Sequence, residues 1–203
     1  MRRGPFSMPL EKEFAGAGVY ALFYLGASRL YAKVRSEDAS WPIYVGKAVP
    51  RGGRKGGVGD GGGRALCSRL AEHSKSIEAA SKLDIDDFAC RYLVVTPLWI
   101  TMAERFLIEH FRPVWNVCIE GFGNHDPGSG RHQGEIAWWD ALHPGRAWAK
   151  KLRQTRTGKD AEDRLRAFVK SHQRRALEDV LARQSADDQL VDSENQTDTE
   201  TED

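Results

Sequence analysis

The sequence predicts an α+β fold, in which a small, mostly antiparallel sheet of three strands is flanked by helices. Three observations support this prediction. Aromatic and branched-chain residues gather in three short runs, which is typical of strands. Apolar residues recur every three to four positions in two longer segments, which is typical of helices. A glycine-rich stretch and a long charged C-terminal region add loop insertions and a C-terminal helical extension to this core.

The three strands are expected in the first half of the chain. Residues 1–17 carry no regular pattern and are expected to form an N-terminal arm. The first strand covers residues 19–25, and the second covers residues 41–46. Pro42 opens the second strand, at a position where a missing amide donor is tolerated. Residues 88–95 form the third strand, and the first two strands are expected to pair as a hairpin with a long loop.

Two helices are expected between and after these strands. The first begins near Arg64, and its buried face is marked by four residues at helical spacing: Leu66, Leu70, Ser74 and Ile77. The second begins after Pro97 and ends before Pro113, because the residue before a proline disfavours the helical conformation. Its expected inward residues are Ile100, Ala103, Phe106, Leu107 and Phe111.

The C-terminal third is expected to be a loop followed by a helix. Residues 121–146 are rich in Gly, Pro and His and are expected to be a loop that contains Trp138 and Trp139. A basic helix is expected from about Ala147 to Arg183, with a break near residues 155–159. Residues 121–185 as a whole are assigned to an extension of the core.

The charge of the chain is divided unevenly. The 203 residues include 30 Lys and Arg and 29 Asp and Glu, and eight of the acids lie in residues 186–203. That segment has no basic or aromatic residue and is expected to be a disordered acidic tail. The remaining 30 basic against 21 acidic residues leave a basic body. This favours a polyanionic partner about as much as a soluble domain with spare basic residues.

Composition excludes several classes of protein. No apolar run approaches the ~18 to 20 residues that span a bilayer, and no apolar signal segment follows Met1, so no membrane partner is expected. Three cysteines without paired spacing fit reduced thiols. Eight of the twelve residues 52–63 are glycine. This loop lacks the Gly-Lys-Ser/Thr ending of a nucleotide-binding loop and is more typical of a basic loop along a phosphate backbone.

One ordered set of residues carries a functional signal. Gly18-Val19-Tyr20 enters the first strand, and Tyr44-Val45-Gly46-Lys47 ends the second. Arg69 and His73 lie four residues apart on the first helix. Glu104 lies on the second helix, and Asn116 follows it in Pro113-Val114-Trp115-Asn116. Each part alone is weak, because a tyrosine in a strand most often serves packing, but the ordered set is specific.

This set resembles the GIY-YIG nuclease superfamily over residues 18–116, with Val19 and Val45 in place of isoleucines. Further segments resemble the type II restriction endonucleases of this superfamily that cut CCGCGG. These segments are the helix pair Arg69 and His73, Ala48-Val49-Pro50, the run from Glu104 through Asn116, Trp138-Trp139-Asp140 and His143-Pro144-Gly145-Arg146.

The resemblance implies a nuclease core at residues 18–120, with a basic glycine-rich insertion at 51–64 and an extension at 121–185 for DNA contact or dimerisation. It implies hydrolysis of double-stranded DNA at a short GC-rich palindrome, CCGCGG being the candidate. A homodimer in the bacterial cytoplasm is expected, with a cognate DNA methyltransferase in the same system. The alternatives are a GIY-YIG nuclease of repair or of a mobile element, and a non-catalytic DNA-binding protein.

Phosphodiester hydrolysis needs a base, a counter-charge and help for the leaving oxygen. Tyr20 is the candidate general base, and its pKa, ordinarily about 10, must be depressed for this role. Lys47, Tyr44 or His73 could depress it. His73 could instead take the proton onward, since an imidazole titrates near neutral pH.

The remaining site residues supply charge and orientation. Arg69 offers a planar fork of donors to a phosphate. Glu104 is the expected ligand of a single Mg²⁺ ion, for which Mn²⁺ can substitute. The resemblance places Asn116 in the active site as an orienting group. Seven basic residues are expected to contact DNA: Lys47, Arg51, Arg54, Lys55, Arg64, Arg131 and Arg146.

Overall fold

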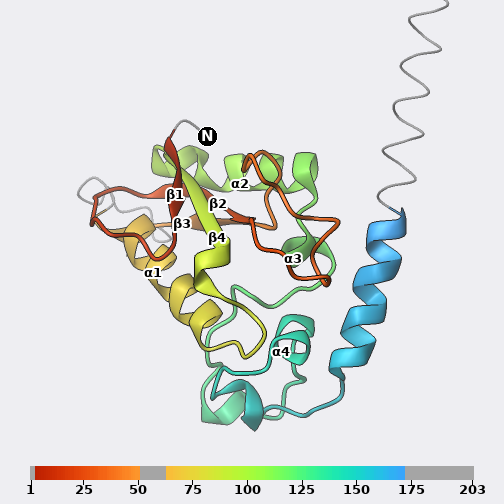
Figure 1. Ribbon diagram of the computed structural model, residues 1–203. Helices are drawn as coiled ribbons and strands as arrows, with labels where there is room; N and C mark the ends of the chain where they lie inside the picture. Colours follow the sequence, from red (N-terminus) through yellow and green to blue (C-terminus); the bar gives the residue numbers. More distant parts are fainter. Residues whose placement is uncertain (1–2, 51–62, 172–203) are drawn as a thin grey trace, which may run out of the picture. The chain divides into compact units, whose positions relative to one another are not determined.

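The computed structural model describes residues 3–50 and 63–171 (Figure 1). Predictions for the acidic tail, for the end of the last helix and for Arg51, Arg54 and Lys55 lie outside the described residues. The chain divides into two units, residues 1–165 and 166–203. Of the second unit, residues 166–171 are described, and they are the last residues described of a helix that begins at residue 158.

The sheet confirms the predicted α+β class and has four antiparallel strands in the order β1-β4-β2-β3. The strands are β1 (Arg3–Ser7), β2 (Gly18–Tyr24), β3 (Tyr44–Ala48) and β4 (Phe88–Val94). Three of them match the expected runs. The fourth, β1, lies in the segment predicted to be an arm, where Phe6 pairs with Cys90 of β4. The second strand begins at Tyr44, so Pro42 lies outside it.

The helices flank this sheet. The longer ones are α1 (Ala65–Glu78) and α2 (Pro97–Phe111), both within the ranges that the sequence predicts. Shorter helical elements are α3 (Val114–Val117), α4 (Trp138–Leu142) and the 3₁₀ turns η2 (Ile85–Asp87), η3 (Ser129–Arg131) and η4 (Ala149–Lys151). The Trp138–Trp139 pair therefore begins a helix and not a loop. The expected basic helix starts at residue 158, about eleven residues later than predicted.

The two faces of the sheet bury different side chains. Strand residues alternate between faces, so one face of β2 presents Val19, Ala21 and Phe23. This face packs on α2 through Ile100 and Leu107. Burying such side chains stabilises the fold by about 1.5 to 3 kcal/mol each.

The opposite face carries an aromatic core. Trp115 of α3 contacts Phe88 of β4 with ring centroids 5.6 Å apart, and it meets Trp139 of α4 edge-on at 5.7 Å. The predicted stripe of α1 is buried here, with Leu66, Leu70 and Ile77 at 1% exposure or less. Because Tyr20 lies between Val19 and Ala21 in β2, it also points to this face, toward α1.

Strand β3 lies at the edge of the sheet, and Asn116 covers that edge. The Asn116 side chain accepts a hydrogen bond from the Val45 amide and donates one to the Val45 carbonyl, both at 2.8 Å. A carboxamide has the same donor and acceptor as a peptide group, so it replaces the missing neighbouring strand. This contact fixes the main chain between Tyr44 and Gly46.

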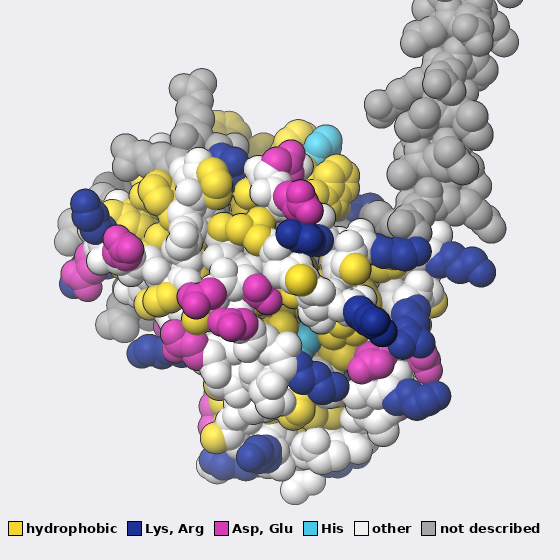
Figure 2. Space-filling model, viewed as in Figure 1, with side chains coloured by type: hydrophobic (Ala, Val, Ile, Leu, Met, Phe, Trp, Pro, Cys, Tyr) yellow, Lys and Arg dark blue, Asp and Glu magenta, His cyan; other side chains and the backbone are white. Residues whose placement is uncertain are grey.

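Helix α2 has an unexpectedly exposed apolar face. Phe106, predicted to be buried, is 64% exposed, and Leu98, Trp99 and Met102 are 79%, 52% and 61% exposed. Residues 98, 102 and 106 are four apart and therefore share one side of the helix. Hydrophobic side chains gather in the upper part of Figure 2, where α2 lies in Figure 1. The prediction failed because apolar residues surround much of α2, and only one side can face the sheet.

A buried polar cluster lies under the aromatic core. The Tyr31 hydroxyl hydrogen-bonds to Nε2 of His143 and accepts a hydrogen bond of 2.9 Å from the Trp115 indole. His143 has no exposed surface, and burial lowers its pKa to about 3. It is therefore neutral at physiological pH.

We expect the free energy of unfolding to fall as the pH drops below about 6.5, the ordinary pKa of histidine. Between that pH and about 3, the unfolded chain binds a proton at His143 that the folded chain does not. The loss from this residue approaches ~1.4 kcal/mol per pH unit. Urea unfolding between pH 5 and 8 measures it. His143→Gln should reduce the slope below pH 6.5, whereas replacement of the exposed His110 by Gln should not. An unchanged slope in His143→Gln contradicts this assignment.

Candidate active site

The centre of the site is a hydrogen bond between a strand and a helix. The Tyr20 hydroxyl, on β2, lies 2.5 Å from Nε2 of His73, on α1. Both residues are at most 2% exposed. His73 is on the buried face of α1 because it follows Leu66 by seven residues, which is two helical turns. The structure therefore brings these two candidate site residues together.

Tyr44 joins this pair from the neighbouring strand. Its ring centroid lies 6.2 Å from that of Tyr20 and 5.3 Å from that of His73. The register explains the approach, because Tyr20 pairs with Gly46, two residues beyond Tyr44 on the same face of β3. A Cβ atom on Gly46 would overlap the Tyr20 hydroxyl. The glycine of this motif therefore leaves space for the phenol.

Burial shifts the pKa values of Tyr20 and His73 in the directions that favour their neutral forms. Burial raises the pKa of Tyr20 well above its usual value, Tyr44 raises it further, and Arg69 opposes the shift. Burial, followed by the charge of Arg69, holds the pKa of His73 well below its usual value. The prediction that neighbours depress the pKa of Tyr20 is therefore wrong. At neutral pH the pair consists of a phenol and a neutral imidazole.

Arg69 brings a positive charge to the edge of this cluster. Its guanidinium donates hydrogen bonds to the Gly123 carbonyl at 2.8 Å and to Glu72 at 2.9 Å, and it also contacts Nε2 of His125. The side chain remains 20% exposed. A cavity of about 280 Å³ lies beside Arg69 and His73. A phosphate can therefore approach the guanidinium from solvent.

Glu104 and Lys47 form an ion pair close to this cluster but on the other face of β3. The Lys47 ammonium lies 2.7 Å from the Glu104 carboxylate. Lys47 pairs with Val19, so it points away from Tyr20 and toward α2. Lys47 does not act on Tyr20 directly, contrary to prediction. The Glu104 charge nevertheless contributes to the raised pKa of Tyr44, after burial as the main cause. The Lys47–Glu104 ion pair and the tyrosine–histidine cluster therefore lie on opposite faces of the edge strand β3.

The surroundings of Glu104 suit a hydrated divalent cation. Its side chain is 18% exposed, and its present partner is a cation. Within residues 3–50 and 63–171, no three His, Cys, Asp or Glu side chains form a metal cluster. Mg²⁺ commonly takes only one or two carboxylates and completes its shell with waters and phosphate oxygens. Glu104 is the residue that would hold such an ion, which would neutralise phosphate charge and activate a bound water.

Three other predicted residues lie outside the cluster of Tyr20, Tyr44 and His73. Asn116 does not point toward Tyr20, and both of its side-chain polar atoms bond to the Val45 main chain. Arg64 is exposed and pairs with Glu13, and Arg131 is exposed on η3. Both remain available to DNA.

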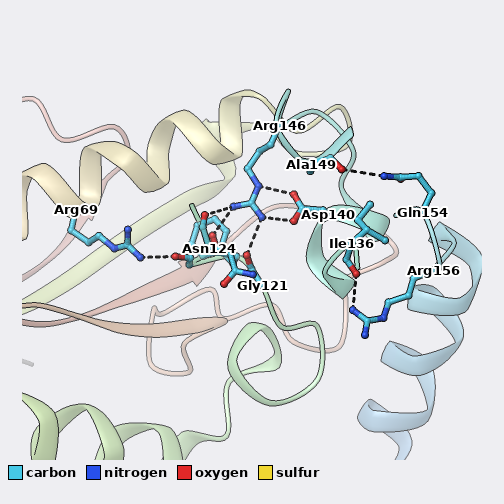
Figure 3. Close-up of polar contacts among 11 residues, drawn as sticks. Arg69, Gly121, Asn124, Ile136, Asp140, Arg146, Ala149, Gln154 and Arg156 are labelled. Carbon is cyan, nitrogen blue, oxygen red and sulfur yellow. Dashed lines mark hydrogen bonds and ion pairs between the residues drawn. The ribbon is translucent and has the colours of Figure 1, made fainter. Parts of the chain in front are cut away.

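Arg146 is buried, contrary to its predicted role as a DNA contact. It is 5% exposed, and its guanidinium donates two hydrogen bonds of 2.6 Å to Asp140. Figure 3 shows Arg69 and Arg146 approaching the same loop, which contains Gly121 and Asn124, from two sides.

Sequence reasoning missed the contribution of residues 121–125. Phe122 stacks on the His73 ring with centroids 4.5 Å apart, and Gly123 accepts the hydrogen bond from Arg69. A Cβ atom on Gly123 would lie 2.6 Å from the Tyr44 hydroxyl. The Gly-Phe-Gly sequence at 121–123 was an available signal, because paired glycines often mark close approach of the backbone.

Fold and site define a GIY-YIG nuclease: both motif tyrosines face one histidine beside a charged arginine, on an antiparallel sheet flanked by helices. The family model described as the Eco29kI GIY-YIG domain matches residues 12–173. The chain belongs to this restriction endonuclease family and is a DNA endonuclease. No curated protein matches the sequence. Within the described part of the chain, the helices lack the combined length and apolar character that crossing a membrane requires.

Substitution of Gly46 tests the packing of the two phenols. We expect Gly46→Ala to displace Tyr20, because the added methyl would overlap its hydroxyl. Overpacking of this kind costs about 1 to 3 kcal/mol of stability. A displaced catalytic group lowers the cleavage rate by roughly a hundredfold. Thermal unfolding and single-turnover cleavage measure the two effects.

Gly130→Ala is the matched control, because nothing lies within 4 Å of a Cβ atom there. It should change neither stability nor cleavage. Equal effects of the two substitutions would show that the approach of Gly46 to Tyr20 is unimportant.

Proposed function

We propose that this protein is a type II restriction endonuclease that cuts double-stranded DNA at a short GC-rich palindrome, with CCGCGG as the candidate site. The observation that carries the proposal is the meeting of Tyr20, Tyr44 and His73 beside the partly exposed Arg69. Phenol, imidazole and guanidinium supply a proton path and a positive charge, which are two requirements of phosphodiester hydrolysis.

The Tyr20–His73 pair acts as one base. With His73 neutral, its Nε2 accepts the hydrogen bond of the Tyr20 hydroxyl. Tyr20 then passes its proton to His73 while it takes up the proton of the attacking water. This coupled transfer removes the need for a free phenolate, which the raised pKa of Tyr20 disfavours. Tyr44, on the more exposed side, orients the water or the phosphate.

Arg69 stabilises the negative charge that develops on the phosphate. Its side chain is already ordered by Glu72 and Gly123, so little side-chain entropy is lost when the phosphate binds. Glu104 would hold one Mg²⁺ ion, for which Mn²⁺ could substitute, and the Lys47 ammonium, now paired with Glu104, would then be free to contact a DNA phosphate. Asn116 acts indirectly by fixing β3.

The metal proposal is tested with plasmid DNA and the variant Glu104→Ala. We expect discrete fragments from the wild type in Mg²⁺ or Mn²⁺, and binding without cleavage in Ca²⁺. Glu104→Ala should bind DNA and cut at least a hundredfold more slowly, because the charge that holds the ion is lost. Glu37→Ala, which removes an exposed carboxylate paired with Arg35, is the matched control and should cut normally.

Two outcomes of that assay contradict the proposal. Random nicking by the wild type would favour a nuclease of repair or of a mobile element. Binding without cleavage in every metal would favour a non-catalytic DNA-binding protein.

A homodimer is part of the proposal, because a palindrome presents the same cleavage site on both strands. The exposed face of α2 supports a second copy of the chain as its partner. Leu98, Trp99, Met102 and Phe106 expose half or more of their surface, which is unusual for four large apolar residues on one helix. Arg105 and Glu109 on the same helix form an ion pair, so two copies of this face do not repel one another.

The helix arrangement keeps this face away from the catalytic groups. Glu104 lies on the partly buried side of α2, beside Lys47, whereas Met102 lies on the exposed side. A cognate methyltransferase and a bacterial cytoplasmic location complete the proposal.

Met102→Glu tests the dimer. A carboxylate at the centre of the apolar face should convert the dimer to a monomer at micromolar concentration, because an unpaired charge in an interface costs several kcal/mol. Sedimentation velocity measures the change, and circular dichroism verifies that the fold is retained. Gln133→Glu, at an exposed position outside α2, should remain dimeric. A dimeric Met102→Glu protein would place the interface elsewhere.

A further inference from the structure

We propose that Arg146 is a positioning residue for DNA cleavage, which it serves by holding residues 121–125 in the shape that places Arg69 and His73. This inference rests on the proposed nuclease function. It replaces the expectation that Arg146 contacts DNA, because the side chain is buried and its donors are used inside the protein.

Arg146 contacts one carboxylate and one loop of the main chain. Nε and Nη2 each donate a hydrogen bond of 2.6 Å to the Asp140 carboxylate. The guanidinium also donates to three main-chain carbonyls of one loop: Gly121 at 2.9 Å, Phe122 at 2.9 Å and Asn124 at 3.1 Å. One rigid planar group therefore fixes three of four consecutive carbonyls.

Two tryptophans hold the guanidinium in its plane. The Arg146 guanidinium carbon lies 4.6 Å from the ring centroid of Trp139 and 4.6 Å from that of Trp148. Such cation–π contacts are stronger when water is excluded, as it is from the buried Trp139. Asp140 lies next to Trp139 on α4, so one helix supplies both the carboxylate that pairs with Arg146 and a ring that stacks on it. The site is built to fix the orientation of one arginine.

The other side of the same loop contacts residues of the candidate site. The Gly123 carbonyl accepts the 2.8 Å hydrogen bond of Arg69. The Phe122 ring is stacked on His73 at 4.5 Å with an interplanar angle of 19°, and it meets Tyr44 edge-on at 4.9 Å. In Figure 3, Arg69 reaches the loop from the left of the view and Arg146 reaches it from above. Loop residues 122 and 123 thus transmit the position of Arg146 to three site residues.

Apart from one turn hydrogen bond of 3.1 Å from the Asn124 amide to the Gly121 carbonyl, the loop depends on side chains for support. Residues 121–125 belong to no helix or strand, so neighbouring strands do not fix their main chain. Gly121 has a φ of +110°, which other residues rarely adopt. Loss of Arg146 would remove the donor to the Phe122 and Asn124 carbonyls, the first of which is in a buried contact, and the loop would rearrange to reach water. A displacement of about 1 Å in a catalytic group can cost a hundredfold in rate.

Arg156 provides a matched control in the same region. It also stacks on a tryptophan, with 4.7 Å between its guanidinium carbon and the Trp138 ring centroid. It donates to a main-chain carbonyl, that of Ile136, at 2.6 Å, and to Glu135 at 3.2 Å. None of these partners lies in residues 121–125. Figure 3 shows the two arginines on different segments.

The experiment compares Arg146→Lys with Arg156→Lys in the full chain. Lysine keeps the charge but cannot make the forked contacts. We expect Arg146→Lys to lower the single-turnover cleavage rate roughly tenfold to a hundredfold. DNA affinity, measured in Ca²⁺, should stay within about threefold of the wild type, because phosphate contacts are unchanged. Arg156→Lys should change neither quantity by more than about threefold.

A readout independent of cleavage follows the His73 ring by proton NMR, with its signal assigned by its loss in His73→Gln. The stacked Phe122 ring shifts this signal, so Arg146→Lys should move it and Arg156→Lys should not. The NMR measurement separates the positioning role of Arg146 from the proposed nuclease function. If the wild type cuts no DNA while the signal moves, the nuclease proposal fails and the positioning contact stands.

Phe122→Leu guards against a folding defect in Arg146→Lys, since a buried ion pair that loses geometry can destabilise a protein. It removes the ring on His73 and leaves Arg146 intact, and it should lower the cleavage rate by a similar factor. A fall in DNA affinity with an unchanged rate would overturn the proposal and restore the DNA contact. Equal losses in both arginine variants, or an unmoved His73 signal, would also overturn it.

Discussion

The buried hydrogen bond between Tyr20 and His73 is the interaction on which the site depends. It joins the central strand β2 to α1, and neither group can be ionised there at low cost. A hydroxyl or an imidazole nitrogen left without its partner in this environment costs about 1 to 3 kcal/mol. The same contact therefore fixes α1 on the sheet and pairs a proton donor with an acceptor. If the proposed mechanism holds, stability and proton transfer share this one contact.

The other groups are arranged around this contact by main-chain geometry. Asn116 fixes β3 through Val45, which sets the place of Tyr44, and Gly46 leaves room for the Tyr20 hydroxyl. The Glu104–Lys47 ion pair lies across the same edge strand, so one layer of backbone separates it from the Tyr20–His73 pair. A phosphate bound at the edge of β3 could contact residues on both faces of this strand. In the proposed mechanism the two faces of the sheet would divide the chemistry, with proton transfer on one face and the metal ligand on the other.

Local patterns predicted much of this arrangement, and long-range contacts account for most of the errors. The buried stripe of α1 and the strand of Tyr20 follow from residue spacing alone. Pairing of β1 with β4 could not be predicted, because it joins segments more than eighty residues apart and carries little local signal. Phe106 was misplaced because spacing identifies an apolar side but not which side meets the sheet. Arg146 looked like a surface charge because its burial depends on distant carbonyls and tryptophans.

The most direct test of the account is a double-mutant cycle on Tyr20→Phe and His73→Gln, measured as single-turnover cleavage at saturating enzyme. If the two residues act as one base, each single variant should lose roughly 10² to 10⁴ in rate. The double variant should then be only a few-fold slower than the slower single variant, because the unit is already broken. Losses that multiply would contradict the account, since they would show that Tyr20 and His73 act in separate steps.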